Sequence, residues 1–154
     1  MNASIHGSGD VAVDDISGDA NAKIHGSGDV QLGDVSGDVS LRIHGSGDVW
    51  TDEVSGGANL STHGSGDLHL ASINGPTKAS SHGSGDIEIK NGRAENLTVR
   101  TSGSGDFEFK GTATNPDLTA RGSGDIKISR HEGTLSTRGD GDIRVSGVYY
   151  SDND

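Results

Sequence analysis

The sequence contains no cysteine, so neither disulfide bonds nor thiolate metal sites contribute, and the redox compartment stays undetermined. No apolar run approaches the roughly 20 residues that a membrane-spanning helix needs. No signal peptide precedes Ile5, so we expect a mature fragment that has been trimmed at its N-terminus. Basic residues are few, and the net charge of −11 argues against nucleic acids and anionic membrane surfaces as partners.

Glycine, in contrast, is abundant, and its 26 residues recur largely in one motif. Copies of Gly-Ser-Gly-Asp begin at Gly7, Gly26, Gly45, Gly64, Gly83, Gly103 and Gly122, and an altered copy begins at Gly139. The interval between copies is constant over the first five and varies slightly after them. A period of about 20 residues is typical of a repeat architecture.

Apolar residues alternate with polar ones on both sides of each motif, which is typical of strands with one buried face. A low apolar fraction of 29% would also fit a disordered chain, but disorder would not keep Val, Ile, Leu and Phe at fixed repeat positions. The inward positions hold Val11, Val13, Ile16, Val30, Leu32, Val39, Leu41, Ile43, Val49, Val54, Leu60, Leu68, Leu70, Ile73, Ala79, Ile87, Ile89, Leu97, Val99, Phe107, Phe109, Ile126, Ile128, Leu135, Ile143 and Val145. A unit of this length cannot bury its apolar face alone, so the units must stack.

We therefore predict an all-β fold, a single parallel β-helix (β-solenoid) of about eight coils of about 19 residues, each with two or three short strands. The general chirality of parallel crossovers favours a right-handed winding. We expect one domain over residues 1–154, with residues 147–154 as a C-terminal cap and tail. Within it, Val148, Tyr149 and Tyr150 would cover the last layer and Ser151 to Asp154 would form a polar tail. The first coil should be an exposed edge or pair with another copy.

Strict alternation turns the second, fourth and sixth residues of Ile24-His-Gly-Ser-Gly-Asp outward, so stacking builds three outward columns. The histidine column is His6, His25, His44, His63 and His82, continued by Ser102, Arg121 and Arg138. The aspartate column is Asp10, Asp29, Asp48, Asp67 and Asp86, continued by Asp106, Asp125 and Asp142. The serine column runs from Ser8 and Ser27 to Ser123.

These columns raise two chemical hypotheses. Catalysis is disfavoured, because residues two apart on a strand are separated by about 7 Å, whereas a triad needs contacts of about 3 Å. Metal binding stays open: stacked histidines could share a transition metal, and the aspartates could hold Ca²⁺. The favoured alternative is architectural, with carboxylates accepting backbone N–H bonds at each corner and serine hydroxyls bonding along the stack. We expect no enzymatic activity and no cofactor, with Ca²⁺ or a transition metal as the alternative.

One outward column is not uniform in residue type and holds the only tryptophan, Trp50, between Gln31 and His69 on neighbouring coils. An outward indole could stack on a sugar ring, so Trp50 is a candidate ligand-binding residue. An isolated surface tryptophan with no binding role is the alternative.

The repeated Gly-Ser-Gly-Asp-[Val/Ile]-x-[Val/Ile/Leu] resembles the bacterial auto-transporter adhesin family with the head GIN domain. Gly83 to Ile89, Gly103 to Phe109 and Gly122 to Ile128 carry the resemblance most plainly. It implies an exported β-helix in the periplasm, at the outer membrane or on the cell surface, with no established active site. The regular histidine before the motif and the missing export signal depart from the family pattern. Bactofilin-like cytoskeletal solenoids are a weaker resemblance, without the motif.

We therefore predict a non-enzymatic, rigid, acidic β-helix that acts as an adhesion or interaction module towards protein or glycan surfaces. A metal-binding solenoid that uses the His or Asp columns is one alternative. Another is a structural solenoid that self-associates end to end through its N-terminal coil.

Overall fold

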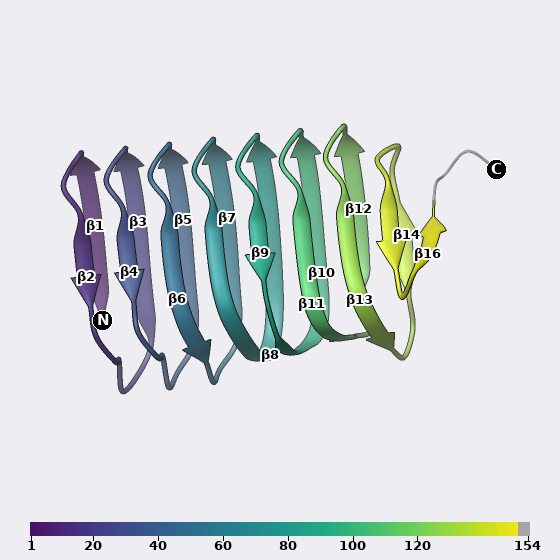
Figure 1. Ribbon diagram of the computed structural model, residues 1–154, viewed down its shortest axis with the longest axis horizontal. Coiled ribbons are helices and arrows are strands. Elements are labelled where there is room, and N and C mark those ends of the chain that lie inside the picture. The colour runs from purple at the N-terminus through teal and green to yellow at the C-terminus, as the bar shows by residue number, and fades with distance from the viewer. Residues whose placement is uncertain (151–154) are drawn as a thin grey trace.

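The computed structural model describes residues 1–150, which wind into a rod of stacked coils (Figure 1). Each coil begins with a strand on one side of the rod, which we call the long face. In most coils this strand has six or seven residues, because the alternation of apolar and polar residues is unbroken up to the first glycine of the motif. The long face consists of β1 (Asn2–Gly7), β3 (Ala20–Gly26), β5 (Val39–Gly45), β7 (Ala58–Gly64), the end of β8 (Leu68–Gly83), the end of β10 (Gly92–Gly103), β12 (Asp117–Gly122) and β14 (Ser136–Arg138).

After the motif the chain turns onto a second side, the short face, where three consecutive residues pair with the next coil in most coils. These strands are β2 (Val11–Val13), β4 (Val30–Leu32), β6 (Val49–Val54), the start of β8, β9 (Ile87–Ile89), β11 (Phe107–Thr114), β13 (Ile126–Glu132) and β15 (Ile143–Val145). A third side closes the coil. In the first coils it is a single bridged residue, with Ile16 paired to Val35 and Val35 to Val54. Further along it becomes strand, as in residues 92–95 of β10, which pair with residues 73–76 of β8.

The stack confirms the predicted parallel β-solenoid. Strands in neighbouring coils pair in parallel and in the repeat register, for example Ile5 with Ile24 and Ile24 with Ile43. In Figure 1 the chain rises through the paler rear strands, crosses to the front at the top and descends there while it advances to the right, which is a right-handed winding. The described residues contain no helix, and hence none that could cross a membrane.

The core lies along the axis of the rod and consists of the apolar positions predicted from the repeat. All of these positions are buried except Val11, Val13 and Leu135, which are half-buried. Val11 and Val13 belong to the first coil, and Leu135 lies directly before the last strand of the long face, β14, near the other end of the rod. The exceptions therefore follow from position along the rod and not from a different residue pattern.

Glycine is required at the corners because backbones of adjacent coils approach each other closely there. A Cβ on Gly26, whose φ is +138°, would lie 2.2 Å from the carbonyl oxygen of Gly7. A Cβ on Gly28 would lie 2.1 Å from the carbonyl oxygen of Gly9. The Ser27 and Gly28 N–H groups both donate to the Gly7 carbonyl, at 2.9 and 3.2 Å. The motif thus permits the main-chain hydrogen bonds that join one coil to the next.

The two ends of the rod differ. The first coil is an exposed edge, as predicted: within the described residues, β1 pairs only with β3, and β2 only with β4. At the other end β16 (Val148–Tyr150) turns back and pairs antiparallel with β15. Val148 and Tyr149 stay exposed, whereas Tyr150 is half-buried and packs against the core, so only one of the three predicted cap residues covers the last layer. The tail predicted at Ser151 to Asp154 lies outside the described residues.

Candidate functional site

The five predicted histidines form a continuous stack on the long face. Neighbouring rings from His6 to His82 have centroids 4.8 to 5.1 Å apart and planes within 5° of parallel. The in-register pairing of successive strands produces this arrangement, because it places each histidine directly over the previous one. The stack is therefore a consequence of the backbone repeat.

A serine two residues before the histidine contacts the ring in three coils. The Oγ atoms of Ser4, Ser61 and Ser80 lie 3.4, 3.3 and 3.1 Å from the Nδ1 atoms of His6, His63 and His82. The prediction that side chains two apart are too distant to touch is therefore wrong for these pairs. The cause is that both side chains project from the same face and lean together at their tips.

No carboxylate completes these pairs within residues 1–150: no Asp or Glu hydrogen bonds or forms an ion pair with a histidine of the stack. The serine of the motif itself, such as Ser27, has no side-chain hydrogen bond among the described residues, so the predicted bonding of serine hydroxyls along the stack is wrong. These serines are exposed at the corner, where neighbouring hydroxyls point into solvent. A Ser-His contact repeated along a flat face has no shared pocket in which to hold a substrate.

Burial and stacking affect the charge state of His63. The pKa of His63 is lowered from its ordinary value, chiefly because burial disfavours the charged imidazolium and also because His44 and His82 would repel it. The neutral form of His63 is therefore favoured where the stack is continuous on both sides.

The metal hypotheses stay predictions. Two nitrogens bound to one zinc ion lie at most about 4.2 Å apart, whereas neighbouring rings of the stack are 4.8 to 5.1 Å apart and parallel. A shared ion would need the rings to tilt towards each other. Within residues 1–150 no group of three or more His, Asp or Glu side chains is placed to hold a metal. Calorimetric titration with Zn²⁺, Ni²⁺ and Ca²⁺ tests both columns.

The aspartate column has the architectural role that was favoured from the sequence. Oδ1 of each aspartate accepts the backbone N–H of the aspartate in the next coil, from Asp10 and Asp29 (3.0 Å) to Asp106 and Asp125 (2.7 Å). A second short column does the same at the third side, where Asp34 accepts the N–H of Glu53 at 3.0 Å. These bonds all run in one direction along the rod.

Trp50 lies on the short face, where its side chain is outward and 40% exposed. Its ring stacks on that of His69, with centroids 5.9 Å apart and planes 12° from parallel. His69 Nδ1 lies 3.4 Å from Glu88 Oε2, and Lys110 Nζ lies 2.9 Å from Glu88 Oε1. The hydrogen bond from Lys110 is the main reason why the pKa of Glu88 is lowered. Trp50 is thus an exposed aromatic ring held by a chain of side-chain contacts.

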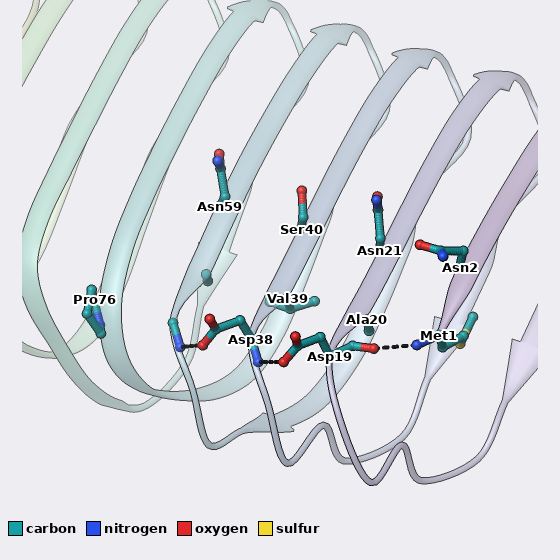
Figure 2. A pocket seen from close by; sticks show the side chains of 12 residues that line it. Met1, Asn2, Asp19, Ala20, Asn21, Asp38, Val39, Ser40, Asn59 and Pro76 are labelled. Carbon is teal, nitrogen blue, oxygen red and sulfur yellow. Dashed lines mark hydrogen bonds between the residues drawn. The ribbon is translucent and has the colours of Figure 1, made fainter.

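A groove of about 600 Å³ runs along the first four coils, beside the start of the long face (Figure 2). One wall is a row of outward polar side chains from consecutive coils: Asn2, Asn21, Ser40 and Asn59. The opposite rim carries Asp19 and Asp38 at the preceding corner. Ala20, Val39 and Ala58 are buried beneath and form an apolar floor.

Sequence reasoning missed this groove, although its signal was present. Asn2, Asn21, Ser40 and Asn59 recur at the same interval as the histidines do. The change from Asn to Ser hides the column, and no motif marks it. The groove is lined by residues from two separate parts of each coil, and the repeat length does not reveal that they lie side by side.

Comparison with known proteins gives one match. The family model described as "Putative auto-transporter adhesin, head GIN domain" matches residues 39–148, which is well over half of the chain. That family is one of adhesin domains and not of enzymes. Neither the curated proteins nor the solved structures contain a match to this chain.

Proposed function

Because the chain belongs to the head GIN domain family of auto-transporter adhesins, we propose that it is a rigid, non-enzymatic interaction module exported to the bacterial envelope or cell surface. The repeated His, Ser and Asp groups support a non-enzymatic role, since the aspartates hold coils together and the Ser-His contacts have no enclosed site. The acidic net charge of −11 favours neutral or basic partner surfaces.

The observation that carries this proposal is the exposed Trp50 ring on the rigid short face. Its stacking on His69 restricts its rotamers before any partner arrives, so binding would order few additional side chains. An aromatic plane that is 40% exposed offers a stacking surface for a sugar ring or an apolar partner side chain.

A glycan array and a bacterial-surface pull-down test this proposal. Trp50→Ala should weaken binding about tenfold or more, whereas Gln31→Ala, at the same register position one coil earlier, should leave it within about twofold. Equal binding by both variants would show that Trp50 does not contribute to the interaction. The absence of any glycan or protein partner for the full chain would contradict the proposed function itself.

Self-association through the first coil is a second candidate function. One observation favours it: Gly9 and Gly18 are glycines that face open space, with no atom within 4 Å of an added Cβ. In the following coil, Gly28 and Gly37 are needed because the preceding backbone leaves no room for a Cβ. The first coil therefore has the glycines that would let a further coil, from a second copy, stack against it.

Concentration-dependent light scattering tests self-association. Gly9→Val should lower the association of the full chain while leaving its melting temperature unchanged, because the added side chain meets nothing in the monomer. Gly28→Val is the matched variant, and it should destabilise the monomer because its Cβ would meet the Gly9 carbonyl. A wild-type chain that stays monomeric at every concentration would exclude this second function.

A further inference from the structure

We propose that the groove along the first four coils binds a linear, neutral, β-linked polysaccharide that lies parallel to the rod axis with one sugar unit per coil. This inference rests on the proposed interaction function and adds to it a site and a ligand class. It concerns a part of the surface separate from Trp50, since the groove lies at the long face and Trp50 is on the short face.

The first argument is periodicity. Each coil adds one polar side chain to the wall, in strict register from Asn2 to Asn59. The polar groups therefore repeat at the spacing of the coils, which is close to the 4.8 to 5.1 Å measured between stacked rings on the same face. A groove with a repeating wall fits a linear ligand whose sugar units repeat at the same interval, with the two edges of successive sugars alternating at the wall. An extended β-linked pyranose chain advances by nearly this distance per sugar.

The second argument is unused hydrogen-bonding capacity. Asp19 and Asp38 use only Oδ1, which accepts the N–H of Asp38 at 2.9 Å and that of Gly57 at 2.8 Å (Figure 2). Their Oδ2 atoms have no partner among residues 1–150. Asn21 Oδ1 is shielded from solvent and has no partner among residues 1–150, so the amide would have to rotate before a sugar hydroxyl could donate to it. Hydroxyl groups donate and accept, so a sugar would satisfy both carboxylate and amide groups.

The third argument is charge. The side chains that line the groove include two carboxylates and no Lys, Arg or His. The N-terminal ammonium group lies at one end, where it donates to the carbonyl oxygen of Asp19. Polyanionic glycans would meet Asp19 and Asp38 without a Lys, Arg or His side chain to pair with, so a neutral chain is favoured.

An extended peptide fits less well. Its side chains repeat on one face about every 6.7 Å, which does not match the spacing of the coils. It would also need main-chain partners, but the strands beside the groove already pair with the coils on both sides, as β3 does with β1 and β5.

Calorimetry with cello-oligosaccharides of two to six units tests the proposal on the full chain. We expect the affinity to rise with length up to about four units, because four coils line the groove, and then to level off. Ser40→Tyr places a ring inside the groove and should weaken binding of the longest oligosaccharide at least about tenfold. Ser61→Tyr, the same change one column and one coil away, should leave it unchanged.

A second measurement does not depend on any variant. Side-chain amide resonances of Asn2, Asn21 and Asn59 should shift on titration of the wild-type chain, whereas that of Asn96 should not. Binding without length dependence, or binding that Ser40→Tyr leaves intact, would overturn the groove proposal. Loss of oligosaccharide binding in Trp50→Ala but not in Ser40→Tyr would place the sugar-binding site at Trp50 on the short face. This result would overturn the groove proposal and leave the proposed function intact. No binding of β-linked oligosaccharides, with a positive array for other partners, would overturn the ligand class alone.

Discussion

Asp48 shows how one side chain fixes the position of the next coil. Its Oδ1 accepts the backbone N–H of Asp67 at 2.8 Å, and its own N–H donates to Asp29 at 2.9 Å. The side chain is part-buried, so removal of the carboxylate leaves the Asp67 N–H with little access to water. The aspartate of the motif is thus a corner residue whose main effect is on the coil that follows.

Asp48→Ala should lower the free energy of unfolding by about 2 kcal/mol, whereas Asp48→Asn, which keeps an acceptor oxygen, should lower it by about 1 kcal/mol. Urea denaturation followed by circular dichroism measures both values. Equal losses in the two variants would mean that the side-chain oxygen contributes nothing beyond the space that it fills.

His63 gives the rod a dependence on pH. Its pKa is lowered in the folded state by burial and by repulsion from His44 and His82, so the unfolded chain takes up this proton at a higher pH than the folded chain does. Stability should therefore fall as the pH drops through the ordinary value of 6.5 and stop falling below the lowered value. Glu88 and Glu132 have pKa values lowered from 4.5 by Lys110 and Arg93. These two carboxylates therefore change the stability only at a lower pH, as it falls through 4.5 and below.

The melting temperature of the wild-type chain should fall between about pH 7.5 and about pH 5, and it should fall less in His63→Asn. Differential scanning calorimetry at several pH values measures the two slopes. Parallel slopes would show that protonation of His63 does not oppose folding.

Among the strands, β11 shows how the core adapts to a larger side chain. Phe107 and Phe109 are fully buried, and both occupy positions that hold Val, Leu or Ile in most other coils, with Thr51 as the exception at the position of Phe109. A Cβ on Gly111 would lie 2.2 Å from the carbonyl oxygen of Gly92 and 2.6 Å from the ring of Phe109, so this glycine makes room for the ring as well as for the neighbouring backbone. The large side chain of Phe109 and the absence of a side chain at Gly111 are therefore complementary within β11.

We expect Gly111→Ala alone to destabilise the protein by about 2 kcal/mol, because the ring must move. In a Phe109→Leu background the same substitution should cost less, because the contact with the ring is gone, but the contact with the Gly92 carbonyl oxygen keeps part of the cost. A double-mutant cycle from denaturant unfolding measures this coupling. Additive losses would contradict the proposed complementarity.

The strand pattern also shows what sequence reasoning could reach. Alternation and the regular repeat period predicted the parallel coils, the inward positions and the outward histidine and aspartate columns. The inward positions and the outward columns follow directly from the alternating direction of side chains in a strand. The strand pairing at residues 92–95 on the third side and the antiparallel return of β16 were not predicted, since they depend on how corners bend. The Ser80–His82 contact depends on the positions of side-chain tips, and the groove depends on how residues of four coils come together, which the sequence does not show.

For the molecule as a whole, the distribution of charged groups follows the order of the coils. Lys and Arg side chains form ion pairs in the later coils, such as Arg93 with Glu132 and Arg138 with Asp117. No Lys or Arg occurs before Lys23. The first coil contains Asp10, Asp14, Asp15 and Asp19 and is therefore strongly acidic. The rod is therefore electrostatically asymmetric, and a partner surface would meet different potentials along its length.

The stacking of coils along one axis, with the N-terminus at one end and β16 at the other (Figure 1), has a mechanical consequence. A load applied between the two ends acts first on the terminal coils, each of which is joined to the rod by a single interface. Pulling should therefore peel coils off in sequence, and each coil would release about 65 Å of extended chain. Single-molecule force spectroscopy should record a series of rupture steps of this length. One rupture that releases the whole chain would contradict this, whereas stepwise yielding would let the protein lengthen under tension while its remaining coils stay folded.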